Sequence, residues 1–251
     1  MRATFPTNPA TRRFAALIVA AGLLAGACGG DPVTTPASAT TSSPASASGR
    51  ADASTGSTPE TEQIPEDFIE VLPAGLRTNM TGVSWRPGCP VGLDDLRLVH
   101  VSYVDFDGNL KAGLLVVHKA IAESALRVFQ ALRKARFPIR SMQLIDQYGG
   151  SDDASMASDN TSAFNCRNVP NTSHWSNHAY GRAIDVNTVE NPYLPKGQVM
   201  PPAGKAFLDR GNVRPGMIVA GDATVKAFQA EGFVWGGAWK SGTDYQHFEK
   251  A

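Results

Sequence analysis

The sequence predicts an α+β fold in one folded domain, residues 64–251, and three observations support this prediction. Strand-like and helical segments are mixed without the regular strand–helix–strand rhythm of a doubly wound sheet. No internal repeat divides the chain. The residues from position 64 onward number roughly 185, which is enough for one substantial hydrophobic core.

A β-hairpin and a helix open the predicted domain. Leu96–Phe106 and Lys111–His118 are rich in β-branched residues and flank the turn Asp107–Asn109, so we expect them to pair. Lys119–Phe137 has a helical apolar period, and Pro138 should end that helix. Its apolar face is formed by Ile121, Ala125, Val128, Phe129 and Leu132.

Shorter elements are expected in the second half of the domain. Ile139–Ile145 should form a strand that leads into a long loop, residues 146–175. Asp222 is a good N-cap and Gly232 a good terminus for a helix between them. Residues 233–249 return to a strand-like composition.

Residues 1–28 have the features of a bacterial export signal. Two arginines precede the apolar run Phe14–Ala27, which is too short to span a bilayer because a spanning helix needs about 20 apolar residues. The run ends in LAGAC, which resembles a lipobox with Cys28 as the lipidated residue; ordinary cleavage and release is the alternative. We therefore expect a lipid-anchored protein on the outer face of the cytoplasmic membrane, or a secreted one.

Residues 29–63 predict a tether between this signal and the domain. They consist mainly of Ser, Thr, Ala and Pro and contain almost no large apolar side chains. Such a segment cannot bury enough surface to offset the entropy of ordering it. The tether would hold the domain in the cell wall just outside the membrane.

The overall composition excludes one class of partner. The chain carries 23 basic and 23 acidic side chains. A nucleic-acid-binding protein normally shows a basic excess, so we expect no nucleic-acid partner. We also expect a monomer.

Cys89 and Cys166 predict a disulfide bond in the exported domain. In an exported protein this pairing is favoured over two free thiols or two metal ligands. It would tie the segment before residue 176 to the start of the domain, and it would stabilise the fold by about 4 kcal/mol in the chain-entropy model.

The stretch SNHAYGRAIDVN, residues 176–187, places two metal-ligating side chains around a turn. His178 offers an imidazole and Asp185 a carboxylate, and both suit zinc. Gly181 permits the turn, and Ala183 and Ile184 suit a buried strand that directs Asp185 inward.

A catalytic zinc needs a third protein ligand, and the C-terminal stretch TDYQHFE offers His247. Asp244 lies three residues before it, where a carboxylate can act as the general base of a hydrolase. Glu249 is the competing candidate for the base. His174 is an alternative ligand, although we expect it to line the cleft or to face solvent.

These motifs resemble those of the M15 metallopeptidases. The pattern S-x-H-x-x-G-x-A-x-D is complete in residues 176–185, and an acidic residue later stands three positions before a histidine. The family includes D-alanyl-D-alanine carboxypeptidases and L-alanyl-D-glutamate endopeptidases, which share the Hedgehog/DD-peptidase fold. The resemblance extends over residues 137–249. It implies a zinc peptidase that cleaves peptidoglycan stem peptides.

The resemblance also assigns roles to residues. The implied zinc ligands are His178, Asp185 and His247, and the implied general base is Asp244. Many relatives carry Glu at the base position, so Asp244 has a shorter reach than they do. Arg167, in FNCR, is the implied stabiliser of the oxyanion that develops on the scissile carbonyl. Its surroundings depart from the Y-R-S form of many relatives.

Two alternatives remain open from the sequence. One is a non-catalytic cell-wall-binding or sensor lipoprotein with a structural zinc site; the intact Asp244 counts against it, because a structural site needs no base. The other keeps the fold but acts on free dipeptides. A separate cluster, Asp152, Asp153 and Asp159, could bind calcium or a cationic substrate group.

Overall fold

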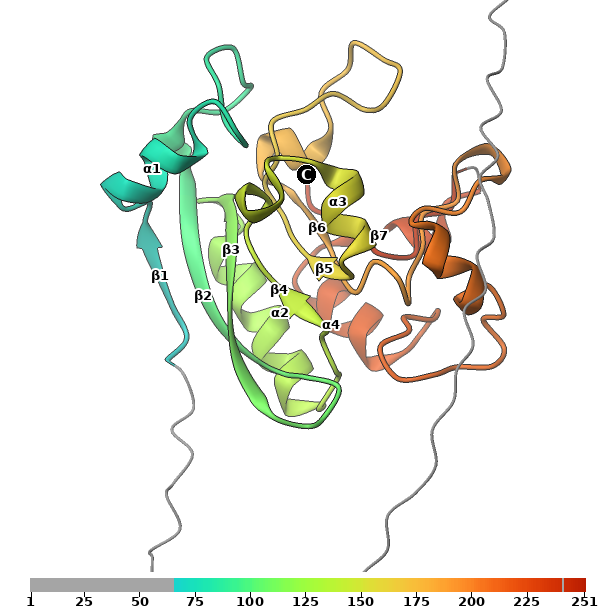
Figure 1. The fold of residues 1–251 in the computed structure, drawn as a ribbon. Coiled ribbons are helices and arrows are strands. Elements are labelled where there is room, and N and C mark those ends of the chain that lie inside the picture. The colour runs from blue at the N-terminus through green and yellow to red at the C-terminus, as the bar shows by residue number, and fades with distance from the viewer. Residues whose placement is uncertain (1–65, 241) are drawn as a thin grey trace, which may run out of the picture. The chain divides into compact units, whose positions relative to one another are not determined.

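The structure, a computed structural model, describes residues 66–240 and 242–251 (Figure 1). The predicted signal at residues 1–28, the lipid on Cys28 and the tether at residues 29–63 lie outside these residues and stay predictions. Among the residues described, no helix is both long and apolar enough to cross a membrane.

An antiparallel sheet forms one layer of the domain, with strand order β1-β2-β3. Its strands are β1 (Phe68–Val71), β2 (Leu96–Val104) and β3 (Leu110–His118). The register pairs Leu96 with His118 and Val104 with Leu110, which confirms the predicted hairpin. Helix α2 (Ala122–Lys134) follows the hairpin and packs against the sheet, as its apolar face predicts (Figure 1).

Two smaller sheets complete the α+β architecture. In the first, β4 (Ser141–Met142) pairs in parallel with β5 (Asn160–Thr161). The second is antiparallel and has the order β6-β8-β7. Its strands are β6 (Ala183–Asp185), β8 (His247–Glu249) and β7 (Val234–Trp235).

Three further α-helices and several short 3₁₀ segments connect the strands. The α-helices are α1 (Ala74–Met80), α3 (Asp152–Ala157) and α4 (Ala223–Ala230). The 3₁₀ segments are Leu93–Asp95, Ile145–Tyr148, Asn177–Tyr180, Pro195–Gly197, Pro202–Phe207 and Gly236–Ala238. Helix α4 begins where predicted, because the Asp222 side chain accepts a hydrogen bond from the backbone N–H of Val225 at 2.7 Å.

The region after residue 138 differs from the prediction. Only Ser141–Met142 of the expected strand pairs, and the expected loop 146–175 contains α3 and β5. The Asn160 side chain explains the short strand pair, since it bonds both the N–H and the C=O of Gln143 at 2.9 Å and so replaces further ladder bonds. Helix α3 starts at a Ser151 cap and is too short to show an apolar period.

The hydrophobic core lies beneath the strands that carry the candidate site. Phe248 is fully buried and stacks on Phe228 of α4 with ring centroids 3.7 Å apart. Phe228 in turn meets Phe129 of α2 edge-on at 6.1 Å. Ile184 is also fully buried. Because side chains alternate along a strand, burying Ile184 and Phe248 directs their neighbours Asp185, His247 and Glu249 to the opposite face.

Asp159, from the predicted acidic cluster, forms a buried carboxyl pair with Glu190. Glu190 is 4% exposed and its Oε2 has no hydrogen-bond partner among the described residues. Arg140 lies 3.5 Å from Asp159 Oδ2 and 4.0 Å from Glu190 Oε1. Burial, and then the adjacent Asp159 carboxylate, raises the pKa of Glu190 to about 8.

We predict that Glu190→Gln raises stability at high pH. Between the ordinary carboxyl pKa and a pH of about 8, Glu190 keeps its proton in the folded state but releases it in the unfolded state. The free energy of unfolding therefore falls as the pH rises through this range. Urea unfolding should show the variant close to wild type at pH 5 and more stable at pH 8. Glu123→Gln, an exposed control on α2, should show no such change; a pH-independent difference for Glu190→Gln would contradict the prediction.

Candidate metal centre

Three residues from two distant segments of the chain meet at one point. His178 Nε2 lies 3.2 Å from Asp185 Oδ2, and His247 Nδ1 lies 3.0 Å from Asp185 Oδ1. The two imidazole nitrogens are 3.3 Å apart. One ligand atom from each residue can be chosen so that all three lie within 4.8 Å of one another. The predicted ligand set is therefore assembled in space.

Local structure explains how each ligand is placed. Strands β6 and β8 pair Asp185 directly with His247. His178 lies in the 3₁₀ turn Asn177–Tyr180, which ends at Gly181 with φ of +64°. A Cβ at Gly181 would approach the backbone nitrogen of His118 to 2.7 Å. Glycine is thus required at this position both by the left-handed conformation and by the close passage of β3.

The outer nitrogen of each histidine is already hydrogen-bonded. His178 Nδ1 donates to the carbonyl of Ala163 at 2.6 Å. His247 Nε2 donates to Glu249 Oε2 at 3.0 Å, and the same carboxylate oxygen accepts from Asn177 Nδ2 at 2.6 Å. Such partners fix the ring orientation and the tautomer of metal-binding histidines. Both remaining nitrogens consequently point at Asp185.

The electrostatics of the cluster favour a cation. Burial opposes ionisation of His247, but hydrogen bonds to Asp185 and Glu249 raise its pKa to about 10. Burial likewise opposes ionisation of Asp185, yet the charge of His178 and the bonds to both histidines hold the pKa of Asp185 well below its usual value. Two imidazoles and one carboxylate with an oriented outer shell fit the three-ligand set of a catalytic zinc site.

Asp244 lies in the cleft beside the cluster. Its backbone N–H donates to the carbonyl of Gly236 at 3.1 Å, and a Cβ at Gly236 would come within 3.1 Å of the Asp244 Cβ and 3.2 Å of the His247 Cβ. The buried Oδ1 of Asp244 has no hydrogen-bond partner in the described part of the chain. Burial, and then the charge of Asp185, raises the pKa of Asp244 to about 7. A carboxyl group in this state can exchange a proton near neutral pH.

Arg167 lines the same cleft as the cluster and Asp244. Burial lowers the pKa of the Arg167 guanidinium group, and the negative charges of Asp185 and then Asp244 partly offset this effect. Trp239 also lines the cleft, with its ring 5.3 Å from that of His247. Trp235, another aromatic residue near the motif, is instead part of the core. The structure thus places Arg167 where a cation could face the reacting groups.

The structure separates the remaining candidates. Glu249 contacts the outer nitrogen of His247, so it orients a ligand and is not placed as a base. His174 is exposed and is not among the residues lining the cleft. The acidic cluster is not a single site, since Asp152 contacts Arg167 and Asp153 lines the cleft, whereas Asp159 pairs with Arg140.

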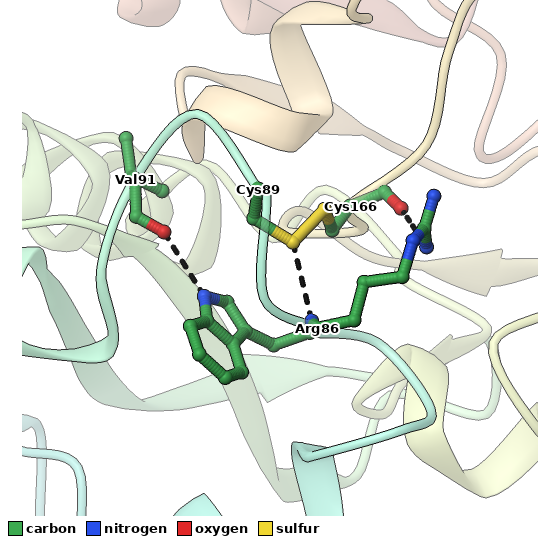
Figure 2. The surroundings of a disulfide bond; sticks show 5 residues. Arg86, Cys89, Val91 and Cys166 are labelled. Carbon is green, nitrogen blue, oxygen red and sulfur yellow. Dashed lines mark hydrogen bonds between the residues drawn. A yellow bond between two sulfur atoms is a disulfide. The ribbon is translucent and has the colours of Figure 1, made fainter.

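The predicted disulfide joins Cys89 to Cys166, across 77 positions of sequence (Figure 2). Arg86 links the same two segments, because its Nη1 donates a hydrogen bond to the carbonyl of Cys166 at 2.7 Å. Cys166 directly precedes Arg167. The disulfide therefore fixes the backbone on one side of the cleft.

Removing the Glu249 side chain should weaken metal binding. Glu249→Ala takes away the acceptor that orients His247, and loss of such an outer partner typically costs about 10- to 100-fold in metal affinity. Competition with a chromophoric zinc chelator measures this effect. Glu123→Ala, an exposed carboxylate on α2, is the control and should bind zinc as tightly as wild type; equal affinity for Glu249→Ala would show that His247 needs no such partner.

A comparison with known protein families matches the C-terminal part of the chain. Residues 170–250 match the model of a family described as D-alanyl-D-alanine carboxypeptidase. The matched residues include His178, Asp185, Asp244 and His247 but not Arg167. Searches of curated proteins and of solved structures gave no match.

Proposed function

From the match of residues 170–250 to the M15 peptidase family model, we propose that the protein is a zinc-dependent peptidase that hydrolyses peptidoglycan stem peptides. The observation that carries the proposal is the convergence of His178, Asp185 and His247 beside Asp244, whose buried Oδ1 has no hydrogen-bond partner within residues 66–240 and 242–251. We also propose the Hedgehog/DD-peptidase fold of that family and, from the predicted export signal, a location outside the cytoplasmic membrane.

The proposed site fits zinc, and its ligands would be His178 Nε2, His247 Nδ1 and the Asp185 carboxylate. A bound zinc ion supplies Lewis-acid chemistry, polarising a substrate carbonyl and acidifying water. Asp244 accepts the proton of the attacking water and returns it to the leaving amine. Arg167 donates hydrogen bonds to the oxyanion that develops on the scissile carbonyl.

The cleft supports a peptide as the ligand. Met156, Tyr193, Met200 and Trp239 provide apolar walls, whereas Ser176 and Asn177 provide polar groups beside the metal cluster. A few convergent polar groups within apolar walls are typical of small-ligand sites. Stem peptides, which combine small apolar side chains with amide groups, match this lining.

Defined stem peptides test the proposal. We expect the purified protein to cleave one of them, with loss of activity on chelation and recovery on adding zinc. Mass spectrometry of the products separates release of a terminal D-alanine from cleavage of the L-Ala–D-Glu bond or of a free dipeptide. Tight binding to purified cell wall with no released peptide would instead favour a non-catalytic wall-binding protein.

A further inference from the structure

Arg167 makes its closest charged contact with Asp152, not with the metal cluster. Its Nε edge meets Asp152 Oδ2, and the two side chains are 29% and 25% exposed. Within the described part of the chain, Nη1 makes a single long hydrogen bond, at 3.4 Å to the carbonyl of Asn168. The carboxylate therefore occupies one edge of the guanidinium group and leaves its terminal nitrogens largely available to the cleft.

A hydrogen bond to its other carboxylate oxygen holds Asp152 in place. Oδ1 accepts a hydrogen bond from Asn165 Nδ2 at 2.7 Å, and that nitrogen also donates to the carbonyl of Gly150 at 3.1 Å. Asn165 is 5% exposed. Because the Asn165 amide is buried and donates to two acceptors, it restricts the position of the Asp152 carboxylate.

The same asparagine reaches both sides of the site through its backbone. Its N–H donates to the carbonyl of His178 at 3.2 Å, and its carbonyl accepts from the N–H of Arg167 at 2.9 Å. Asn165 thus connects the segment of a metal-site histidine with the segment of the cleft arginine. Asp152 adds a further link, because its carboxylate contacts the Arg167 side chain.

We propose that Asp152 is a positioning residue for Arg167: by holding the Nε edge, it aims the guanidinium group at the reacting carbonyl. A free arginine side chain has many rotamers, and fixing one edge removes much of that freedom before substrate binds. This inference rests on the proposed function, because it assumes that Arg167 acts on substrate.

Kinetics of four variants test the inference. Asp152→Asn keeps the acceptor for Asn165 but loses the ion pair, so kcat should fall about 10- to 100-fold, the effect of a misplacement of roughly 1 Å, with KM changed little. Asp152→Glu, which keeps the charge, should retain more of kcat than Asp152→Asn. In an Arg167→Ala background Asp152→Asn should cause no further loss. An equal loss in both backgrounds would overturn the inference.

Asp94→Asn is the matched control. It breaks another arginine–aspartate pair, Arg77 with Asp94 at 2.7 Å, outside the cleft lining. We expect its kcat and KM to equal those of wild type. A loss of kcat as large as that of Asp152→Asn would make the effect non-specific and would contradict the positioning role.

A second measurement does not depend on activity. The Nε–H signal of Arg167, identified by its absence from the Arg167→Ala spectrum, should be visible in ¹H–¹⁵N spectra of wild type and Asp94→Asn. In Asp152→Asn it should be lost to exchange with water. An unchanged signal overturns the inference. If wild type cleaves no stem peptide yet the signal depends on Asp152, the proposed function fails and the positioning contact stands.

Discussion

Asp244→Asn should lower kcat by about 10²- to 10⁴-fold, the usual contribution of a general acid–base group. The amide has nearly the shape of the carboxyl group but cannot take a proton from water. Asp244 Oδ1 has no other partner among the described residues, so the substitution breaks no hydrogen bond to that atom. Stability should not fall, because an amide is less costly to bury than a carboxyl group that can ionise.

The design separates loss of the base from loss of the metal. Zinc content of Asp244→Asn should equal that of wild type, since the three expected ligands are unchanged. Asp94→Asn, at an exposed ion pair, controls for loss of one negative charge. If Asp244→Asn keeps near-wild-type kcat that a chelator still abolishes, another group is the base and the assignment of Asp244 is wrong.

Loss of the disulfide should have the largest effect on stability. The Cys89→Ser/Cys166→Ser double variant frees a loop of 77 positions, which corresponds to about 4 kcal/mol in the chain-entropy model. That is a large fraction of the 5–15 kcal/mol that stabilises a typical domain. Urea unfolding should therefore show a much lower midpoint for the double variant than for wild type.

A reductant provides the internal control for this comparison. Wild type treated with a reductant strong enough to open the bond should unfold like the double variant, and the variant should not respond to the reductant. Because Cys166 adjoins Arg167, kcat should also fall in the variant under conditions where it remains folded. A difference in unfolding free energy below about 1 kcal/mol would mean that the loop is already restrained in the unfolded chain.

Long elements could be predicted from the sequence because their patterns repeat. The hairpin at residues 96–118 and helix α2 each extend over several periods, so their type follows from pattern alone. Strand β4 lies within the strand predicted at Ile139–Ile145, but its short length and its pairing with β5 could not be predicted, because both depend on the Asn160 side chain bonding to Gln143. Strand β1 and helix α1 were likewise not predicted, since four and seven residues carry little periodicity.

The site shows the same division between local pattern and distant contact. His178, Asp185 and His247 were identified from motif spacing, and the structure assembles them. The carbonyl that orients His178 belongs to Ala163, and any residue there would supply the same group, so no sequence signal marks it. Glu249 stood out only as a possible base. Its spacing of two residues from His247 on a strand, which places both on one face, could have indicated an orienting role.

Zinc titration of the metal-free protein tests the central claim most directly. We predict one equivalent bound to wild type, and binding abolished or severely weakened in His178→Ala, Asp185→Ala and His247→Ala. Each variant should keep a cooperative unfolding transition, because the core beneath the site does not depend on these side chains. Zinc bound equally by all three variants, or not bound by wild type, would contradict the claim that these residues hold a single metal ion.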